Sequence, residues 1–317
     1  MTDLLRRAVS GFQKSTVLVI GDCMLDRYLY GDISEVSEGA YPRFVEKSRE
    51  HFRGGAANVA MNIATLGGRA LLLGAVGRDE EAEFLDSCLP FTECHDVLQW
   101  TTVKTRFCDE NGRPIFRMDR DAPPPENPGV FVEAARRLIQ SHAPDIVVIS
   151  DYGKGVVTAE LLSAVLKSGP RVIVDPKPAH ASYYHGAFLI KPNYAEAVAM
   201  NQSAAGSDAE TVAKGLAHRF GGNIVLSLGP RGAIAVEIPG ETITRHHNEP
   251  ATEPNVIGAG DALVAGIALG LAAGLSLSGA AELGNVVAGI KVRKRATEPV
   301  SAKELVLELL RRVETAA

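Results

Sequence analysis

The sequence has few of the features that mark a zinc-binding or disulfide-stabilised protein. Its 317 residues include only four cysteines, Cys23, Cys88, Cys94 and Cys108, and no two of them have C-x-x-C spacing. Zinc sites need short paired spacings, and a chain of this length can be stabilised by its core alone. We therefore expect reduced thiols in a cytoplasmic protein, and no zinc site.

Long hydrophobic runs and an excess of basic charge are also missing. The formal net charge is −5, which disfavours nucleic acid as the main partner and makes a small molecule the expected ligand. The longest apolar stretch, residues 262–290, contains Glu282 and is interrupted by glycines, so two buried helices explain it better than a membrane span. Residues 16–20 form an apolar run of strand length without the layout of a signal peptide. The sequence therefore predicts no membrane partner.

The residues that are abundant indicate a globular α/β chain. Hydrophobic residues make up 46% of the sequence and charged residues 22%, which are ordinary globular values. In the second half of the chain, short apolar runs alternate with helical sequence, and each run ends in polar residues or glycine. Such runs are typical of central parallel strands, whose polar ends gather along one edge of a sheet. The runs are residues 145–150, 171–174, 188–190 and 223–228.

The polar residues that follow these strands are candidates for a ligand site. Lysines beside aspartates can be structural ion pairs, but three successive strands with such ends favour a site. Basic groups, a carboxylate that can accompany Mg²⁺ and an anion hole together suit phosphoryl transfer. Asp22 and Asp26, after the first strand, are candidates for binding hydroxyls, although an aspartate-capped turn explains them equally well. The other candidates at the strand ends are Asp151, Lys154, Asp175, Lys177, Asn193 and Glu196.

A glycine-rich turn, Gly258-Ala259-Gly260-Asp261, opens an apolar helix near the end of the chain. Unpaired N–H groups and the helix dipole make such a junction a site for a phosphate or a developing phosphoryl charge. A carboxylate in its first turn can accept the proton of an attacking hydroxyl. Taken alone, the motif is also explained by a tight turn whose aspartate complements the helix dipole.

A second glycine turn, Gly54-Gly55, opens a helix that contains Asn58. Glycine lets the backbone approach a ligand, and the Asn58 amide could bind sugar hydroxyls, although helix packing is an alternative role for the glycines. Around this turn, residues 27–52 and 98–120 alternate polar and apolar side chains, and Asn111-Gly112 is a hairpin signal. We predict a small sheet from these two segments that covers the site and excludes water.

With both glycine motifs present in this order, the chain resembles the ribokinase-like (PfkB) carbohydrate kinases over nearly its whole length. The resemblance implies a single kinase domain over residues 1–317. It would have a doubly wound, mostly parallel sheet flanked by helices, and a small β-sheet lid. It also implies ATP as donor and Mg²⁺ as cofactor. Within the family the chain is most similar to the D-glycero-D-manno-heptose 7-phosphate kinases, and we expect the stand-alone kinase form. This similarity rests on residues 21–28, 54–63, 150–155, 174–177 and 299–301.

The resemblance also implies a role for individual residues. Asp261 would be the catalytic base, and Gly258, Ala259 and Gly260 would form the anion hole. Glu196 would lie near Mg²⁺, directly or through water. Residues implied on the nucleotide side are Asn193, Ser227, Gly229, Gly258, Gly260 and Asn285. Residues implied on the sugar side are Asp22, Asp26, Gly54, Gly55 and Asn58. An anionic acceptor also needs counter-charges, for which we infer Arg106, Lys154 and Lys177.

The sequence departs from its relatives at two places. Most relatives carry an acidic residue and two threonines before the glycine turn, where this chain has Asn255, Val256 and Ile257. The acidic position belongs to a monovalent-cation site in the family, so the resemblance leaves dependence on potassium open. Residues 37–44 are also bulkier and poorer in proline than is typical of heptose kinases, which leaves the acceptor sugar open.

The sequence thus predicts an ATP-dependent sugar kinase acting on a phosphorylated heptose. A kinase of another sugar or sugar phosphate is an alternative hypothesis for the enzyme. A homologue that binds nucleotide or sugar without turnover is a non-enzymatic alternative. We expect a homodimer that pairs through the lid strands, because exposed edge strands favour pairing. ATP and a small sugar phosphate are the expected partners.

Overall fold

The computed structural model describes residues 9–34, 42–87, 92–202, 206–249 and 254–316. Cys88 lies outside these residues, as does most of the departure at residues 37–44. Within them, nine strands form the main sheet, in the spatial order β13-β12-β11-β10-β9-β8-β1-β4-β5. Their bounds are β1 (Thr16–Gly21), β4 (Arg69–Ala75), β5 (Thr92–His95), β8 (Ile146–Ser150), β9 (Arg171–Asp175), β10 (Leu189–Ile190), β11 (Asn223–Ser227), β12 (Ala233–Glu237) and β13 (Thr242–His246).

The main sheet is parallel from β11 to β5, and only β12 and β13 run antiparallel to their neighbours. The predicted central strands are present because they are apolar on both faces: every residue of β8 is buried. The two antiparallel strands β12 and β13 at one end of the sheet were not predicted. They follow a short 3₁₀ turn, η3 (Gly229–Arg231), instead of a helix, which lets the chain double back beside β11.

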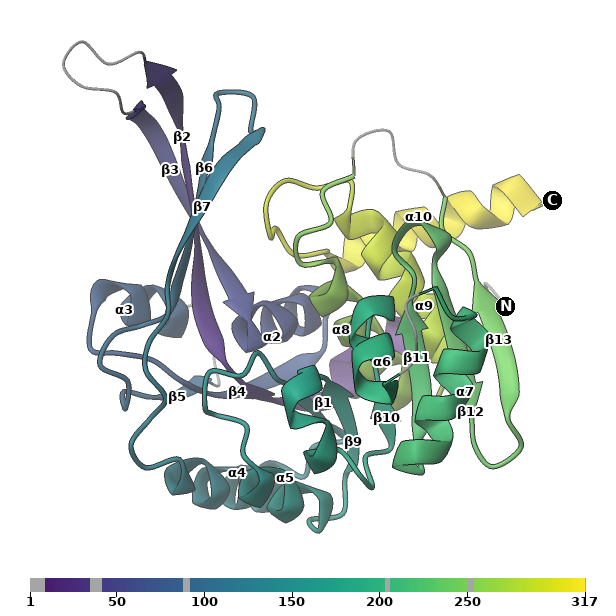
Figure 1. The fold of residues 1–317 in the computed structure, drawn as a ribbon. Helices are drawn as coiled ribbons and strands as arrows, with labels where there is room; N and C mark the ends of the chain where they lie inside the picture. Colours follow the sequence, from purple (N-terminus) through teal and green to yellow (C-terminus); the bar gives the residue numbers. More distant parts are fainter. Residues whose placement is uncertain (1–8, 35–41, 88–91, 203–205, 250–253, 317) are drawn as a thin grey trace.

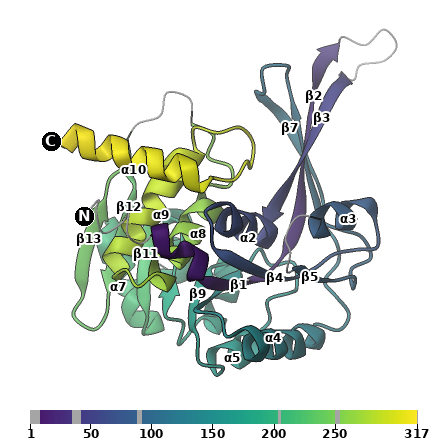
Figure 2. The same cartoon turned by 180° about the vertical axis from the view of Figure 1, so that it is seen from behind.

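Helices cover both faces of the main sheet, so alternate residues of one strand enter different cores (Figures 1 and 2). Val17 and Val19 of β1 pack with one helical layer, whereas Leu18 and Ile20 pack with the other. The first layer contains α2 (Ala56–Thr65), α3 (Glu80–Asp86), α8 (Ala259–Ala272), α9 (Leu277–Lys291) and α10 (Ala302–Ala316). The second contains α4 (Gly129–His142), α5 (Ala159–Leu166), α6 (Tyr194–Asn201) and α7 (Ala209–Phe220). This arrangement confirms the predicted doubly wound α/β fold.

The apolar stretch at residues 262–290 folds as the two buried helices α8 and α9. Their glycines serve packing, since a Cβ added at Gly266 would lie 2.7 Å from the Cα of Gly284. None of the helices in the described part of the chain is long and apolar enough to span a membrane.

A second sheet of four described strands begins beside α2 and α3, and its far end projects beyond the helical layers (Figure 1). Its spatial order is β3-β2-β6-β7, with β2 (Cys23–Ser34), β3 (Arg43–Gly55), β6 (Val103–Cys108) and β7 (Pro114–Arg120). The smaller sheet was predicted, but β2 begins at Cys23 rather than near residue 27. Only Asp22 separates β1 from β2, because Cys23 already pairs with Gly55 of β3. Asp26 therefore lies in a strand and not in a turn.

Candidate active site

Asp261 lies in the first turn of α8, where Gly258 adopts a left-handed conformation with φ 76°. The side chain is buried, with 5% of its surface exposed. One carboxylate oxygen accepts a hydrogen bond of 2.5 Å from Nδ2 of Asn58, and the other accepts one of 2.9 Å from the Tyr152 hydroxyl. Burial raises the pKa of Asp261, and these two hydrogen bonds oppose the rise. The site therefore holds a basic carboxylate in a fixed orientation.

The bond from Asn58 joins the two glycine motifs, which are 203 residues apart in the sequence. Asn58 comes from α2, whose N-cap Gly55 has φ 58°, where a side chain would be strained and would approach Asp22. Nδ2 of Asn62 donates to Oδ1 of Asn58 at 3.1 Å, which orients the Asn58 amide with its N–H groups toward Asp261. Gly54 is equally restricted, because an added Cβ would lie 2.8 Å from a carboxylate oxygen of Asp26.

Asp22 holds the loop that carries Tyr152. Its carboxylate accepts hydrogen bonds from the backbone N–H groups of Tyr152, Lys154 and Val156, at 2.9, 3.0 and 3.1 Å. Burial raises the pKa of Asp22, against the effect of these bonds. Asp22 thus places the Tyr152 hydroxyl beside Asp261, and a contact between Asp22 and substrate stays a prediction.

Lys191, which follows β10, belongs to the site although it was not among the predicted residues. Its buried ammonium pairs with Asp175 at 3.0 Å, and a Cβ added at Gly260 would lie only 3.5 Å from its Nζ. Burial favours a lower pKa for Lys191, but the charge of Asp175 outweighs it and raises that pKa. A cation therefore lies beside the N-terminus of α8. Burial raises the pKa of Asp175 to about 7 despite this pairing. The sequence signal was a lysine directly after a buried strand, as at the candidates Lys154 and Lys177.

A cavity of about 690 Å³ connects these groups with the nucleotide-side candidates. Asp261, Gly258, Ala259 and Gly260 line it at the start of α8. Asn285 reaches it from α9, where its amide donates to the backbone carbonyl of His247. The cavity therefore gathers the predicted nucleotide-side groups, and Asn58 reaches its edge only through the hydrogen bond to Asp261. The other predicted residues that do not line it are Asp22, Asp26, Gly54, Gly55, Arg106 and Lys154. Further lining residues at the ends of β8, β9 and β11 and at the start of α6 are Tyr152, Lys177, Asn193, Glu196, Ser227 and Gly229.

Asn193 and Glu196 form a capping box at the start of α6. Oδ1 of Asn193 accepts from the Glu196 N–H at 2.9 Å, and one oxygen of Glu196 accepts from the Asn193 N–H at 2.8 Å. The other oxygen of Glu196 has no such bond among the described residues. No group of three His, Cys, Asp or Glu side chains forms a metal cage in the described ranges. Mg²⁺ bound with a nucleotide needs only one or two carboxylates besides phosphates and water. Glu196 and Asp175, which interact electrostatically, fit that requirement.

On the side of the smaller sheet, two of the predicted phosphate-binding residues are already paired. Arg106 of β6 donates to Asp26 of β2 at 2.5 Å, and the Lys154 ammonium lies 2.5 Å from a carboxylate oxygen of Asp121. Lys104, on the same strand as Arg106, has no ion pair with a described residue. Its Nζ lies 4.9 Å from the ring centroid of Tyr152, and burial lowers its pKa. Sequence reasoning missed Lys104, because only strand pairing brings it over the tyrosine that bonds Asp261.

Comparison with known proteins agrees with this fold. A bifunctional protein HldE from Caulobacter sp. strain K31 is 38% identical over 323 residues, covering 96% of this chain and 65% of that protein. This chain thus spans less than two thirds of that relative. The crystal structure of phosphofructokinase-2 from Escherichia coli in complex with potassium superposes with a TM-score of 0.79 and 23% identity, over 94% of this chain and 98% of that one. Ribokinase from Arabidopsis thaliana, complexed with ribose and ATP, gives a TM-score of 0.71 and 18% identity, over 93% and 98% of the two chains.

The class of protein follows from the fold and the sequence match together. It is a phosphotransferase with an alcohol group as acceptor, in a ribokinase-like α/β fold. A sequence model of the pfkB family carbohydrate kinases matches residues 14–303, and the chain belongs to that family.

Proposed function

We propose that the chain is an ATP-dependent kinase that transfers the γ-phosphoryl group to a hydroxyl of a phosphorylated heptose. The acceptor we propose is D-glycero-D-manno-heptose 7-phosphate, giving the 1,7-bisphosphate. Residues 1–317 would act as one kinase domain, with the smaller sheet as its lid. The observation that carries the proposal is Asp261, a buried carboxylate oriented by Asn58 and Tyr152 at a helix N-terminus that lines a cavity.

The proposed chemistry assigns one task to each group. Asp261 accepts the proton of the acceptor hydroxyl as that oxygen bonds to the γ-phosphorus, and the bond to the ADP oxygen breaks. The N–H groups at the start of α8 and the Lys191 ammonium stabilise the negative charge on the transferred group. Glu196 and Asp175 would hold Mg²⁺, which neutralises charge on the phosphates when it is bound. The smaller sheet would exclude water, so that transfer to the sugar is favoured over hydrolysis.

Two observations support an anionic acceptor. Lys104 is a cation without an ion-pair partner among the described residues, and it lies over the ring of Tyr152, whose hydroxyl bonds Asp261. Arg106, although paired with Asp26, is beside it on β6. Similarity to heptose 7-phosphate kinases at residues 21–28 and 150–155 and the HldE relative support heptose as the sugar. The family match itself also fits a kinase of another sugar or sugar phosphate, which is the second candidate.

A panel of acceptors, with coupled detection of ADP and Mg-ATP as donor, tests the proposal. We expect turnover with heptose 7-phosphates, slower turnover with hexose phosphates, and the lowest rate with free sugars. Turnover of another sugar with no activity on any heptose phosphate would replace the acceptor but keep the kinase. Nucleotide binding without ADP release for every acceptor would instead favour the non-catalytic homologue.

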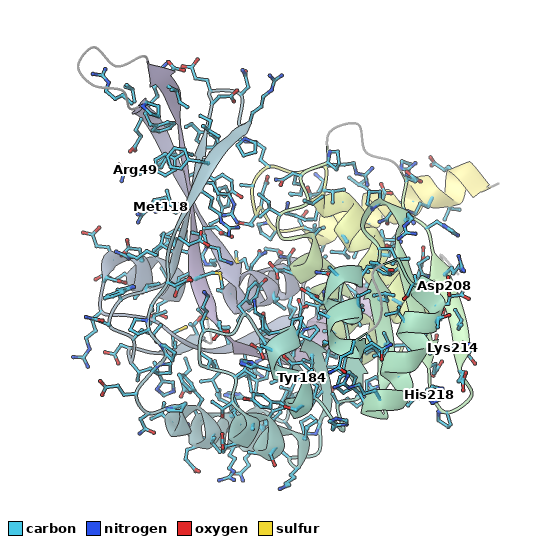
Figure 3. All side chains as sticks on the ribbon, in the orientation of Figure 1. Arg49, Met118, Tyr184, Asp208, Lys214 and His218 are labelled. Atoms are coloured by element: carbon cyan, nitrogen blue, oxygen red, sulfur yellow. The ribbon has the colours of Figure 1, made fainter. Side chains whose placement is uncertain are left out.

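We further propose that the protein forms a homodimer through the smaller sheet. Every residue of β7 is exposed, and Phe116 and Met118 expose 48% and 53% of their surface. Figure 3 shows Met118 on this sheet, away from Tyr184 in the body of the protein. Ile33 and Ile115 are also exposed apolar residues of β2 and β7. A projecting sheet that exposes several large apolar side chains is a candidate protein interface. A cytoplasmic location stays a prediction.

A further inference from the structure

Lys291 at the end of α9 is a charged residue for which the proposed chemistry has no task. None of its surface is exposed, and it is not among the residues that line the cavity. Fully buried lysines are rare, because removing an ammonium from water costs free energy unless other groups compensate. Its Nζ donates a hydrogen bond of 2.8 Å to the backbone carbonyl of Ala296, and it forms no ion pair with a described residue.

The carbonyl that Lys291 holds belongs to residues 293–297, which we call the strap. Nδ2 of Asn255 also donates to the strap, to the carbonyls of Lys294 at 3.2 Å and Ala296 at 2.8 Å. Ala296 has φ 41°, a conformation that costs a non-glycine residue free energy and that persists only where its surroundings impose it. The Lys291 ammonium and the Asn255 amide are therefore what fix the strap at this point.

The strap and Lys291 both pack against the turn at Gly258, where α8 begins. A Cβ added at Gly258 would lie 3.3 Å from Cγ2 of Thr297 and 3.6 Å from Cε of Lys291. The same Cβ would lie 2.9 Å from Nδ2 of Asn58, the group that bonds Asp261. Gly258 thus lies between the aliphatic part of the Lys291 side chain and the Asn58 amide. A shift of the lysine or the strap would move the start of α8.

We propose that Lys291 is a positioning residue that serves as a built-in monovalent cation beneath the turn carrying Asp261. Its ammonium fixes the strap through Ala296 and adds a positive charge near the start of α8. This inference rests on the proposed role of Asp261. Burial lowers the pKa of Lys291 to about 8, whereas the charge of Asp261 opposes the shift, so the group is mostly protonated at neutral pH. The burial disfavours the charged form and thus does not serve stability.

The test compares Lys291→Met and Lys291→Ala with a control on another helix, Lys214→Met. Lys214 lies on α7, pairs with Glu241 and is neither part of the strap nor a lining residue of the cavity. We expect Lys291→Met to lower kcat about ten- to a hundredfold, as small misplacements in an active site do, with little change in KM for ATP. Its thermal midpoint should stay equal or rise, because a buried charge is removed. Lys214→Met, which removes only an exposed ion pair, should keep kcat within about twofold.

Rescue by added cations separates positioning from a merely structural role. In Lys291→Ala the removed side chain leaves room for a small cation, so ammonium, methylammonium or potassium chloride should restore part of kcat. Sodium chloride controls for ionic strength, and the larger side chain of Lys291→Met should prevent rescue. The unsubstituted protein should need none of these cations. Normal kcat in Lys291→Met, or a folded Lys291→Ala that no cation restores, would overturn the proposal.

A readout without turnover keeps this test independent of the proposed kinase activity. Ammonium or potassium should raise the thermal midpoint of Lys291→Ala in a concentration-dependent way, but not that of the unsubstituted protein or Lys214→Met. If no acceptor is phosphorylated but this stabilisation is seen, the proposed function fails and the cation site stands. If phosphorylation is normal and the stabilisation is missing, the cation proposal fails and the kinase stands.

Discussion

Replacing Asp261 with asparagine removes the proposed base and changes almost nothing in shape. General-base catalysis contributes about 10²- to 10⁴-fold, so kcat should fall by that factor, which corresponds to about 3–5 kcal/mol of transition-state stabilisation. The two donors to Asp261, Asn58 and Tyr152, decide the structural effect. An amide has one oxygen to accept from them, so one donor would face an NH₂ group, at a cost of about 1–3 kcal/mol. Loss of a buried charge offsets part of that cost.

The experiment measures ADP release, ATP binding by calorimetry and the thermal midpoint for Asp261→Asn. We expect a loss of kcat with ATP affinity within about threefold, because the base interacts with the nucleotide only during transfer. Asp79→Asn is a matched control: Asp79 also accepts several hydrogen bonds, from the N–H groups of Ala82 and Thr101, but it does not line the cavity. That variant should lose stability and keep kcat. Near-normal phosphotransfer by Asp261→Asn would refute the assignment of the base.

Four further predictions follow from the same site. The value of kcat/KM should fall as the pH drops below about 7. Burial raises the pKa of Asp261, and raises that of Asp175 to about 7, so both carboxylates lose their active, deprotonated form as the pH falls. A flat profile from pH 5 to 8 would contradict this. Lys104→Gln should raise KM for phosphorylated sugars about tenfold or more and leave that for free sugars unchanged; equal effects on both would remove Lys104 from phosphate binding. Asn58→Ala should lower kcat more than it changes KM for ATP, with steady-state kinetics as the measure, and an unchanged kcat would show that Asp261 needs no such donor. Phe116→Glu should convert a dimer to a monomer in light scattering, whereas a dimer that persists would place the interface elsewhere.

Much of the fold and part of the site can be predicted from the sequence, because the signals involved are local. A strand that is apolar on both faces must lie inside a parallel sheet, so the run at residues 146–150 predicts β8 wherever it lies in the fold. The turn at Gly258 is equally local, because a backbone with φ 76° favours glycine. Polar residues at the ends of parallel strands meet at one edge of a sheet, which is why Asp175, Lys177 and Asn193 line one cavity as predicted.

Only the tertiary structure decides which of these groups bond, which are neutralised and which face the cavity. Asn58 reaches Asp261 across 203 residues, and pairing between β2 and β6 brings Arg106 to Asp26. The start of β2 at Cys23 depends on its register with Gly55 of β3, which no local pattern specifies. Lys191 and Lys291 read in the sequence as ordinary lysines near the ends of a strand and a helix. Packing against Gly260 and Gly258 buries both ammonium groups beside Asp261, and burial together with neighbouring charge, rather than residue type, determines what a lysine does.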